Sequence, residues 1–131
     1  MKLPVKTTAI QARYFDTDAV GHISSNAYVH YMEIGRSEYM MELSRRLNMP
    51  SSVVANINVD YVSETFYGED IKISCWCSRV GSKSLTISNV IYAGERVVSR
   101  GTATLVGFDQ QTRKSVAFPA ELEAVEFSPE G

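Results

Sequence analysis

The hydrophobic and polar residues of this chain alternate in two different periods. In residues 6–15, Ile10, Ala12 and Tyr14 alternate with polar residues, and this period of two predicts a half-buried strand. In residues 26–47 the apolar side chains return every three or four positions, which predicts one long helix. Pro50 follows, and the helix is expected to end before it because proline cannot continue helical hydrogen bonding.

The remainder of the chain has the pattern of strands joined by short turns. The expected strands span residues 53–61, 71–77, 85–92 and 96–108, followed by a polar hairpin at 109–114, a short strand and a last helical turn at 120–124. Gly35 falls inside the predicted helix, where glycine costs about 1 kcal/mol relative to alanine. We therefore expect Gly35 to serve close packing of the helix against a sheet.

One strand, one long helix and four further strands predict an α+β fold with an antiparallel sheet and its helix on one face. The 131 residues are expected to form a single domain, with residues 126–131 as a frayed tail. Such a sheet has an exposed edge, and the helix is too long for the sheet of one chain to cover. We therefore expect a homodimer or homotetramer.

Composition and charge exclude several classes of function. The chain is 44% hydrophobic and 21% charged, as in ordinary globular proteins, and its net charge of −2 argues against binding to nucleic acid. No apolar run approaches the roughly 20 residues of a membrane span, so no membrane insertion is expected. The first residues lack the apolar core of a secretory signal, so the expected location is the cytoplasm.

Two cysteines, Cys75 and Cys77, flank Trp76 in a predicted strand. Residues two apart in a strand share a face and lie roughly 6.6 Å apart, which disfavours a disulfide. Without histidines or carboxylates at ligand spacing, the pair is also a poor zinc site. Buried, reduced cysteines are the better interpretation, and no metal site is predicted.

The candidate chemistry lies in the acidic turn between the first strand and the helix. Asp18 stands just before Ser24, Ser25 and Asn26, three residue types that cap helices. The unpaired N–H groups of a helix start can stabilise an oxyanion while a nearby carboxylate attacks a substrate or deprotonates water. The alternative is that Asp18 only accepts hydrogen bonds from the turn amides.

Two neighbours of Asp18 have other interpretations. Asp16 is expected to be structural, capping the turn or pairing with Arg13. An imidazole can accept or donate a proton near neutral pH, so His22 is either a general base or a residue that braces the turn and shapes the pocket.

The segment Asp16-Thr-Asp18-Ala-Val-Gly21-His22-Ile23, with Tyr28 after it, resembles the motif of hotdog-fold acyl-CoA thioesterases of the 4-hydroxybenzoyl-CoA thioesterase family. The resemblance continues through residues 62–70, 80–84 and 101–106. It implies a hotdog fold, in which a curved antiparallel sheet of about five strands wraps a long central helix. It also implies that two copies join their sheets edge to edge, with an acyl-thioester site between them.

The resemblance implies hydrolysis of an aryl or fatty acyl-CoA to a free acid and coenzyme A. Asp18 is then the nucleophile or general base, and the amides near Ser24, Ser25 and Asn26 form the oxyanion hole. Related sequences carry two asparagines where this chain has Ser24-Ser25, and we expect serine to cap the helix as well. The expected substrate-binding residues are Gly21, His22, Tyr28, Lys83 and Ser84. No cofactor is required. The alternative is a non-catalytic hotdog protein that binds acyl-CoA or an acyl carrier, with a regulatory role.

Overall fold

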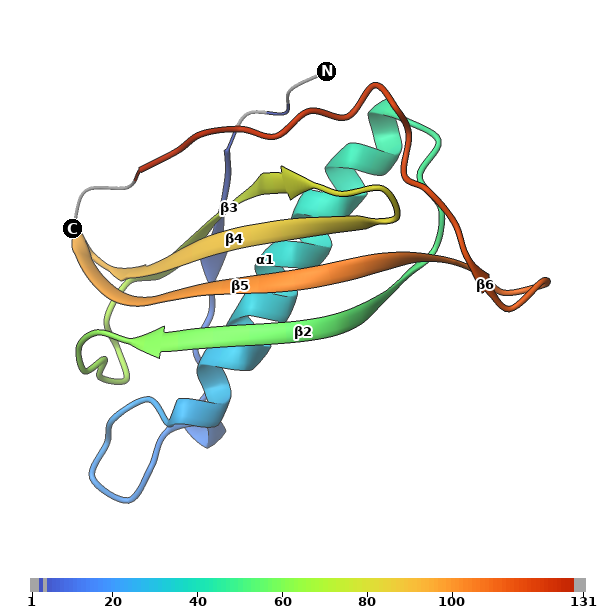
Figure 1. Ribbon diagram of the computed structural model, residues 1–131. Coiled ribbons are helices and arrows are strands. Elements are labelled where there is room, and N and C mark those ends of the chain that lie inside the picture. Colours follow the sequence, from blue (N-terminus) through green and yellow to red (C-terminus); the bar gives the residue numbers. More distant parts are fainter. Residues whose placement is uncertain (1–2, 4, 129–131) are drawn as a thin grey trace.

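One long helix lies across one face of a curved antiparallel sheet (Figure 1). The computed structural model describes residue 3 and residues 5–128. The elements in chain order are β1 (Lys6–Ile10), the 3₁₀ turn η1 (Tyr14–Asp16), α1 (Ser25–Arg46), β2 (Ser52–Tyr61), β3 (Ile71–Val80), β4 (Ser84–Ala93), β5 (Arg96–Asp109) and β6 (Lys114–Ser115). The predicted order of one strand, one helix and four strands is confirmed, and the bounds of α1 agree within one residue.

The strands of the sheet lie in the order β1-β3-β4-β5-β2, and the short strand β6 pairs with the end of β5. Every neighbouring pair is antiparallel. The helix separates β1 from β2 in the sequence, and these two strands form opposite edges of the sheet (Figure 1). The edge at β2 is long, and no other strand among the described residues pairs with its outer side.

Helix α1 packs on β1, β3 and β4 and buries one apolar stripe against them. Its buried residues are Ala27, Tyr28, Tyr31, Met32, Gly35, Tyr39 and Leu43. A Cβ atom on Gly35 would lie 2.7 Å from Ile73 Cγ2 and 3.0 Å from Cys75 Sγ. The expectation that Gly35 permits close packing on the sheet is confirmed.

Cys75 and Cys77 are both buried and unbonded to each other. Burial raises the pKa of the Cys75 thiol to about 12, so this thiol stays protonated at neutral pH. The prediction of buried, reduced cysteines is confirmed.

The first strand is shorter than predicted, since β1 ends at Ile10 instead of residue 15. The Arg13 N–H donates to Asp16 Oδ2 at 2.8 Å, and the Asp16 N–H donates to the Arg13 carbonyl at 2.9 Å. These two bonds close the turn η1, which competes with strand pairing. Tyr14 is consequently 74% exposed and does not continue the inward face of the strand.

The predicted helical turn at residues 120–124 is wrong. The chain makes a single turn there, in which the Leu122 N–H donates to the Pro119 carbonyl, and then extends along the sheet. The Val125 N–H donates to the Cys77 carbonyl, and the Phe127 ring packs on Trp76 with ring centroids 4.8 Å apart. These contacts favour an extended segment over a helix. Residues 129–131 of the predicted frayed tail lie outside the described residues.

Candidate active site

The acidic turn that precedes α1 is closed by the Asp18 carboxylate. Asp18 Oδ1 accepts hydrogen bonds from the N–H groups of Val20 at 2.9 Å and His22 at 3.0 Å. The backbone N–H of Asp18 also donates a hydrogen bond to the carbonyl oxygen of His22, at 2.8 Å. Gly21 has a φ of +84°, a conformation that glycine adopts without strain, and this makes the tight reversal possible. The bonding to turn amides that formed the structural alternative for Asp18 is therefore present.

The second carboxylate oxygen of Asp18 is not used in closing the turn. Asp18 Oδ2 lies 3.6 Å from His22 Nδ1, and the side chain is 41% exposed. The N–H of Val20 is the main cause that lowers the pKa of Asp18, and the N–H of His22 adds to it, against a smaller opposing effect of desolvation. Asp18 is therefore ionised at neutral pH and keeps one oxygen toward solvent.

The start of α1 presents free amide donors. Ser24 is the N-cap residue, with an extended backbone, and its N–H donates to the Asp16 carbonyl at 2.7 Å. Ser24 therefore stands at the N-cap, where a serine was expected, but its hydroxyl makes no capping hydrogen bond. In the described part of the chain, no acceptor binds the N–H groups of Ser25 and Asn26. These two donors carry the positive end of the helix dipole.

Asp16 is structural, as predicted, and ties the turn to the helix. Its buried carboxylate accepts hydrogen bonds from the Arg13 backbone and guanidinium and, at 2.8 Å, from the Tyr31 hydroxyl. Desolvation opposes ionisation of Asp16, but these hydrogen bonds outweigh it and lower its pKa. The turn is thereby held against the second turn of α1.

The loop between β2 and β3 braces the acidic turn from the other side, and sequence reasoning missed its roles. Thr65 is buried; its carbonyl accepts the Ile23 N–H at 2.7 Å, and its Oγ1 accepts the Tyr28 hydroxyl at 2.8 Å. The Phe66 ring lies 4.8 Å from the His22 ring. The resemblance at residues 62–70 was the only signal for this loop, and it assigned no contact.

Tyr28, a predicted substrate-binding residue, belongs to the core. It is buried, and its ring packs against those of Tyr31 and Tyr61 with centroids 6.3 and 5.5 Å away. Tyr61, at the end of β2, is the exposed member of this cluster, and its hydroxyl donates to the Ser25 carbonyl at 3.0 Å. Tyr61 was not among the predicted site residues.

Large apolar side chains surround the acidic turn and remain exposed. We call them the aromatic rim: Tyr14, Phe15, Val20, Phe66 and Tyr67, which are 45–92% exposed. Two of them contact each other, since the Tyr14 and Tyr67 rings meet edge to face with centroids 6.1 Å apart. An exposed apolar patch of this kind indicates a surface that binds a ligand or another protein chain.

Lys83 and Ser84 lie far from Asp18 within one chain. Val106 pairs with Ser84 on one side and with Val53 on the other, at the end of the sheet where β2 begins. The acidic turn lies near the end where β2 stops, at Tyr61 (Figure 1). At about 3.3 Å per residue, the strand from Val53 to Tyr61 separates the two ends by roughly 25 Å. A single chain therefore does not bring these two residues to the turn.

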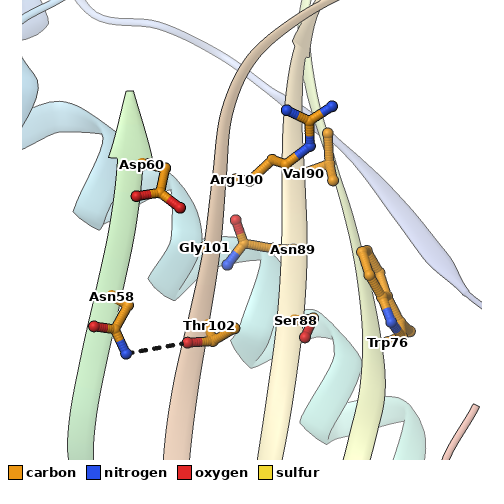
Figure 2. A pocket seen from close by; sticks show the side chains of 9 residues that line it. All are labelled: Asn58, Asp60, Trp76, Ser88, Asn89, Val90, Arg100, Gly101 and Thr102. Carbon is orange, nitrogen blue, oxygen red and sulfur yellow. Dashed lines mark hydrogen bonds between the residues drawn. The ribbon is translucent and has the colours of Figure 1, made fainter. Parts of the chain in front are cut away.

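A groove of about 230 Å³ lies on the outer face of the sheet, away from α1 (Figure 2). Its lining residues are Asn58, Asp60, Trp76, Ser88, Asn89, Val90, Arg100, Gly101 and Thr102. It contains none of the predicted site residues, so it is separate from the candidate site.

Two other classes of site are not found within residue 3 and residues 5–128. In that part of the chain no three His, Cys, Asp or Glu residues group as metal ligands. No helix there combines the length and the apolar character needed to cross a membrane.

Comparison with known proteins gives consistent matches along the chain. The family model of the thioesterase-like superfamily matches residues 13–125. The uncharacterized protein YsmA of Bacillus subtilis is 29% identical over 122 residues, which cover 86% of this chain and 78% of YsmA. Acyl-CoA thioesterase YbgC of Haemophilus influenzae is 25% identical over 125 residues, with 88% and 89% covered. The structure of a predicted thioesterase from Bacillus stearothermophilus has a TM-score of 0.80 at 30% identity, with 89% and 90% covered.

Proposed function

Because this chain belongs to the thioesterase-like superfamily, a family of thioester hydrolases, we propose that it hydrolyses acyl-CoA at the acidic turn. Acyl-CoA as the substrate class is supported by the relative YbgC, which is named an acyl-CoA thioesterase. One observation carries the assignment of the site: an ionised carboxylate with an open oxygen lies in the same turn that leads to two free helix-start amides. The products are a free acid and coenzyme A.

The chemistry needs a nucleophile and a place for the negative charge that forms on the thioester oxygen. Asp18 Oδ2 either takes a proton from a water molecule, whose oxygen then attacks the carbonyl carbon, or attacks that carbon itself. In both routes the C–S bond breaks and coenzyme A leaves as a thiolate. Attack by water gives the free acid directly, whereas attack by Asp18 gives a mixed anhydride, which water must then hydrolyse to release the acid and restore the carboxylate. The N–H groups of Ser25 and Asn26 stabilise the oxyanion, a contribution of about 3 to 4 kcal/mol for one good donor.

A second copy of the chain completes the site in this proposal. The unpaired edge strand β2 exposes four apolar side chains, Val53, Val54, Ile57 and Tyr61, each 38–54% exposed. Pairing two β2 strands around a two-fold axis would cover them. Antiparallel pairing also places the beginning of one β2 beside the end of the other. The 83–84 turn of one copy would then lie at the same end of the dimer as the Asp18 turn of the other.

The test is the substitution Asp18→Asn, assayed with aryl, short-chain and long-chain acyl-CoA substrates and a thiol-detecting reagent. We expect kcat to fall by about 10² to 10⁴-fold, the usual contribution of a general base. Asp109→Asn is a matched control, because Asp109 Oδ1 also closes a turn by accepting the N–H groups of Gln111 and Thr112. This control separates loss of a turn contact from loss of catalysis.

Two results would contradict the proposal. Full activity in Asp18→Asn would exclude this residue from the chemistry. A wild-type protein that binds acyl-CoA and hydrolyses none of the panel would instead be a non-catalytic binding protein.

A further inference from the structure

The side chain of Tyr61 donates a hydrogen bond into the first turn of α1. Tyr61 is the last residue of β2, and this strand ends beside the start of the helix (Figure 1). The Tyr61 hydroxyl oxygen lies 3.0 Å from the carbonyl oxygen of Ser25, the first residue of α1. A carbonyl oxygen has two lone pairs, so this one can accept from Tyr61 in addition to its helical partner. The edge of the sheet is therefore tied to the helix start.

The bond falls on the peptide unit that carries one of the two free amide donors. The Ser25 carbonyl and the Asn26 N–H belong to the same planar peptide unit and point in opposite directions. Fixing the oxygen therefore fixes the direction of the N–H. A donor at the oxygen also polarises the unit and strengthens its N–H as a donor, by about 10 to 30% for one bond.

Tyr61 is held in place by its backbone and by its ring. Its backbone pairs with Ser99 of β5, and its ring packs on that of Tyr28 with centroids 5.5 Å apart. Tyr28 is itself buried and bonded to Thr65 Oγ1 at 2.8 Å. Because Tyr61 is 54% exposed, water could replace Ser25 as the partner of its hydroxyl, so the bond contributes little to the stability of the fold.

We propose that Tyr61 is a positioning residue of the active site, which orients and polarises the peptide unit between Ser25 and Asn26 as part of the oxyanion hole. This inference rests on the proposed function. Tyr61 also belongs to the β2 edge, so the proposed pairing with a second copy would exclude water from its hydrogen bond and strengthen it.

The kinetic test is Tyr61→Phe, which keeps the ring on Tyr28 and removes only the hydroxyl. We expect kcat for acyl-CoA hydrolysis to fall by about two- to tenfold, the effect of losing one hydrogen bond. KM should change little, because the negative charge on the thioester oxygen develops only in the transition state. Loss of a merely structural contact would not produce this division between kcat and KM.

Nuclear magnetic resonance of the substrate-free protein tests the contact itself. A hydrogen bond to a carbonyl oxygen deshields the carbonyl carbon and the amide nitrogen of the same peptide unit. In Tyr61→Phe, the Ser25 carbonyl carbon and the Asn26 amide nitrogen should therefore both move upfield. Tyr92→Phe is the control variant, because it removes the same hydroxyl from a partly buried tyrosine of β4 that packs on the cluster around Trp76. It should change neither the two resonances nor kcat.

The outcomes separate this inference from the proposed function. If the wild type hydrolyses acyl-CoA and Tyr61→Phe has the same kcat, the role of Tyr61 is overturned and the function stands. Unchanged resonances of Ser25 and Asn26 overturn the role as well, even with a lower kcat, because the hydroxyl would then act elsewhere. If the wild type hydrolyses no acyl-CoA, the proposed function fails and this role fails with it, whatever the resonances show.

Discussion

Asp16 and Asp18 stand two residues apart in the chain and have different environments. Asp16 is 4% exposed and accepts hydrogen bonds from Arg13 and Tyr31. Asp18 has 41% of its side chain exposed, and only one of its oxygens is bound by turn amides. Both carboxylates are ionised at neutral pH, but only Asp18 retains an oxygen for substrate. Their environments therefore assign a structural role to Asp16 and leave Asp18 as the candidate for chemistry.

The contacts of Asp16 predict a loss of stability in Asp16→Asn. The variant replaces charge-assisted hydrogen bonds by weaker neutral ones, and we expect the free energy of unfolding to fall by about 2 kcal/mol at neutral pH. The folded pKa of Asp16 lies below its ordinary value of 3.8. Its contribution is therefore fully present above about pH 4 and is lost as the pH falls through the folded pKa. Urea unfolding of both proteins from pH 7 to pH 2.5 measures this difference.

The two stability curves should draw together as the pH falls, because protonation of Asp16 removes the charge on which the advantage of the wild type depends. A constant difference at every pH would contradict the ionic origin of the effect.

At the residue scale, the sequence predicted local contacts and missed distant ones. The pairing of Asp16 with Arg13 spans three positions in the chain, so residue types and spacing were sufficient. The bonds from Tyr31 to Asp16 and from Tyr28 to Thr65 span 15 and 37 positions. These depend on how the helix and the 62–70 loop pack, which no local pattern specifies. The same applies to Tyr61, which reaches Ser25 only in the folded chain.

Helix α1 depends on one glycine for its distance from the sheet. Because a Cβ on Gly35 would meet side chains of β3 at 2.7 to 3.0 Å, the helix and the strand would have to separate locally. We expect Gly35→Ala to lower the free energy of unfolding by about 1 to 3 kcal/mol, although alanine has the higher helix propensity by about 1 kcal/mol. Thermal or urea unfolding measures the change.

Ser37→Ala is the matched control, because Ser37 is exposed in the same helix. It should leave stability nearly unchanged or raise it slightly. A stabilised Gly35→Ala variant would show that the helix moves away from the sheet at no cost.

At the element scale, periodicity located α1 and the long strands, and it failed where polar contacts compete with it. Alternation continued past Ile10, but the bonds between Arg13 and Asp16 end the strand. The 120–124 segment had helical residue types, but the extended chain gains the contacts of Val125 and Phe127 with the sheet. The first error comes from a local turn that competes with the strand, and the second from tertiary contacts with the sheet.

The whole molecule has an asymmetric sheet, with a short edge at β1 and a long apolar edge at β2. The fold class and an exposed edge were predictable from the number and order of elements. The sequence did not predict which strand forms that edge, because β2 is followed by β3 in the chain but pairs with β5 in the sheet, and no local pattern specifies that crossover. The proposed dimer and the location of the aromatic rim follow from the folded chain.

The β2 edge predicts a coupling between assembly and activity. Ile57 is 38% exposed in β2, and a lysine there would place a charge on the edge that the second copy covers. We expect Ile57→Lys to be a monomer by analytical ultracentrifugation and to lose at least tenfold in acyl-CoA hydrolysis, since each site would lack its second copy. The measurement compares sedimentation and kcat of the variant and the wild type.

Met41→Lys serves as the control, because Met41 is 52% exposed on α1 and outside the β2 edge. It should leave both assembly and hydrolysis unchanged. An active Ile57→Lys monomer would place the complete site within one chain.

The C-terminal segment over the sheet has a practical consequence. Trp76 is the one tryptophan of the sequence, is 7% exposed, and is covered by Phe127. Its intrinsic fluorescence therefore reports whether that segment is seated, since release of the segment would admit water to the indole and shift the emission to longer wavelength. The protein thus carries its own optical probe on the far side of the sheet from the acidic turn, and this probe can follow the C-terminal segment without any added label.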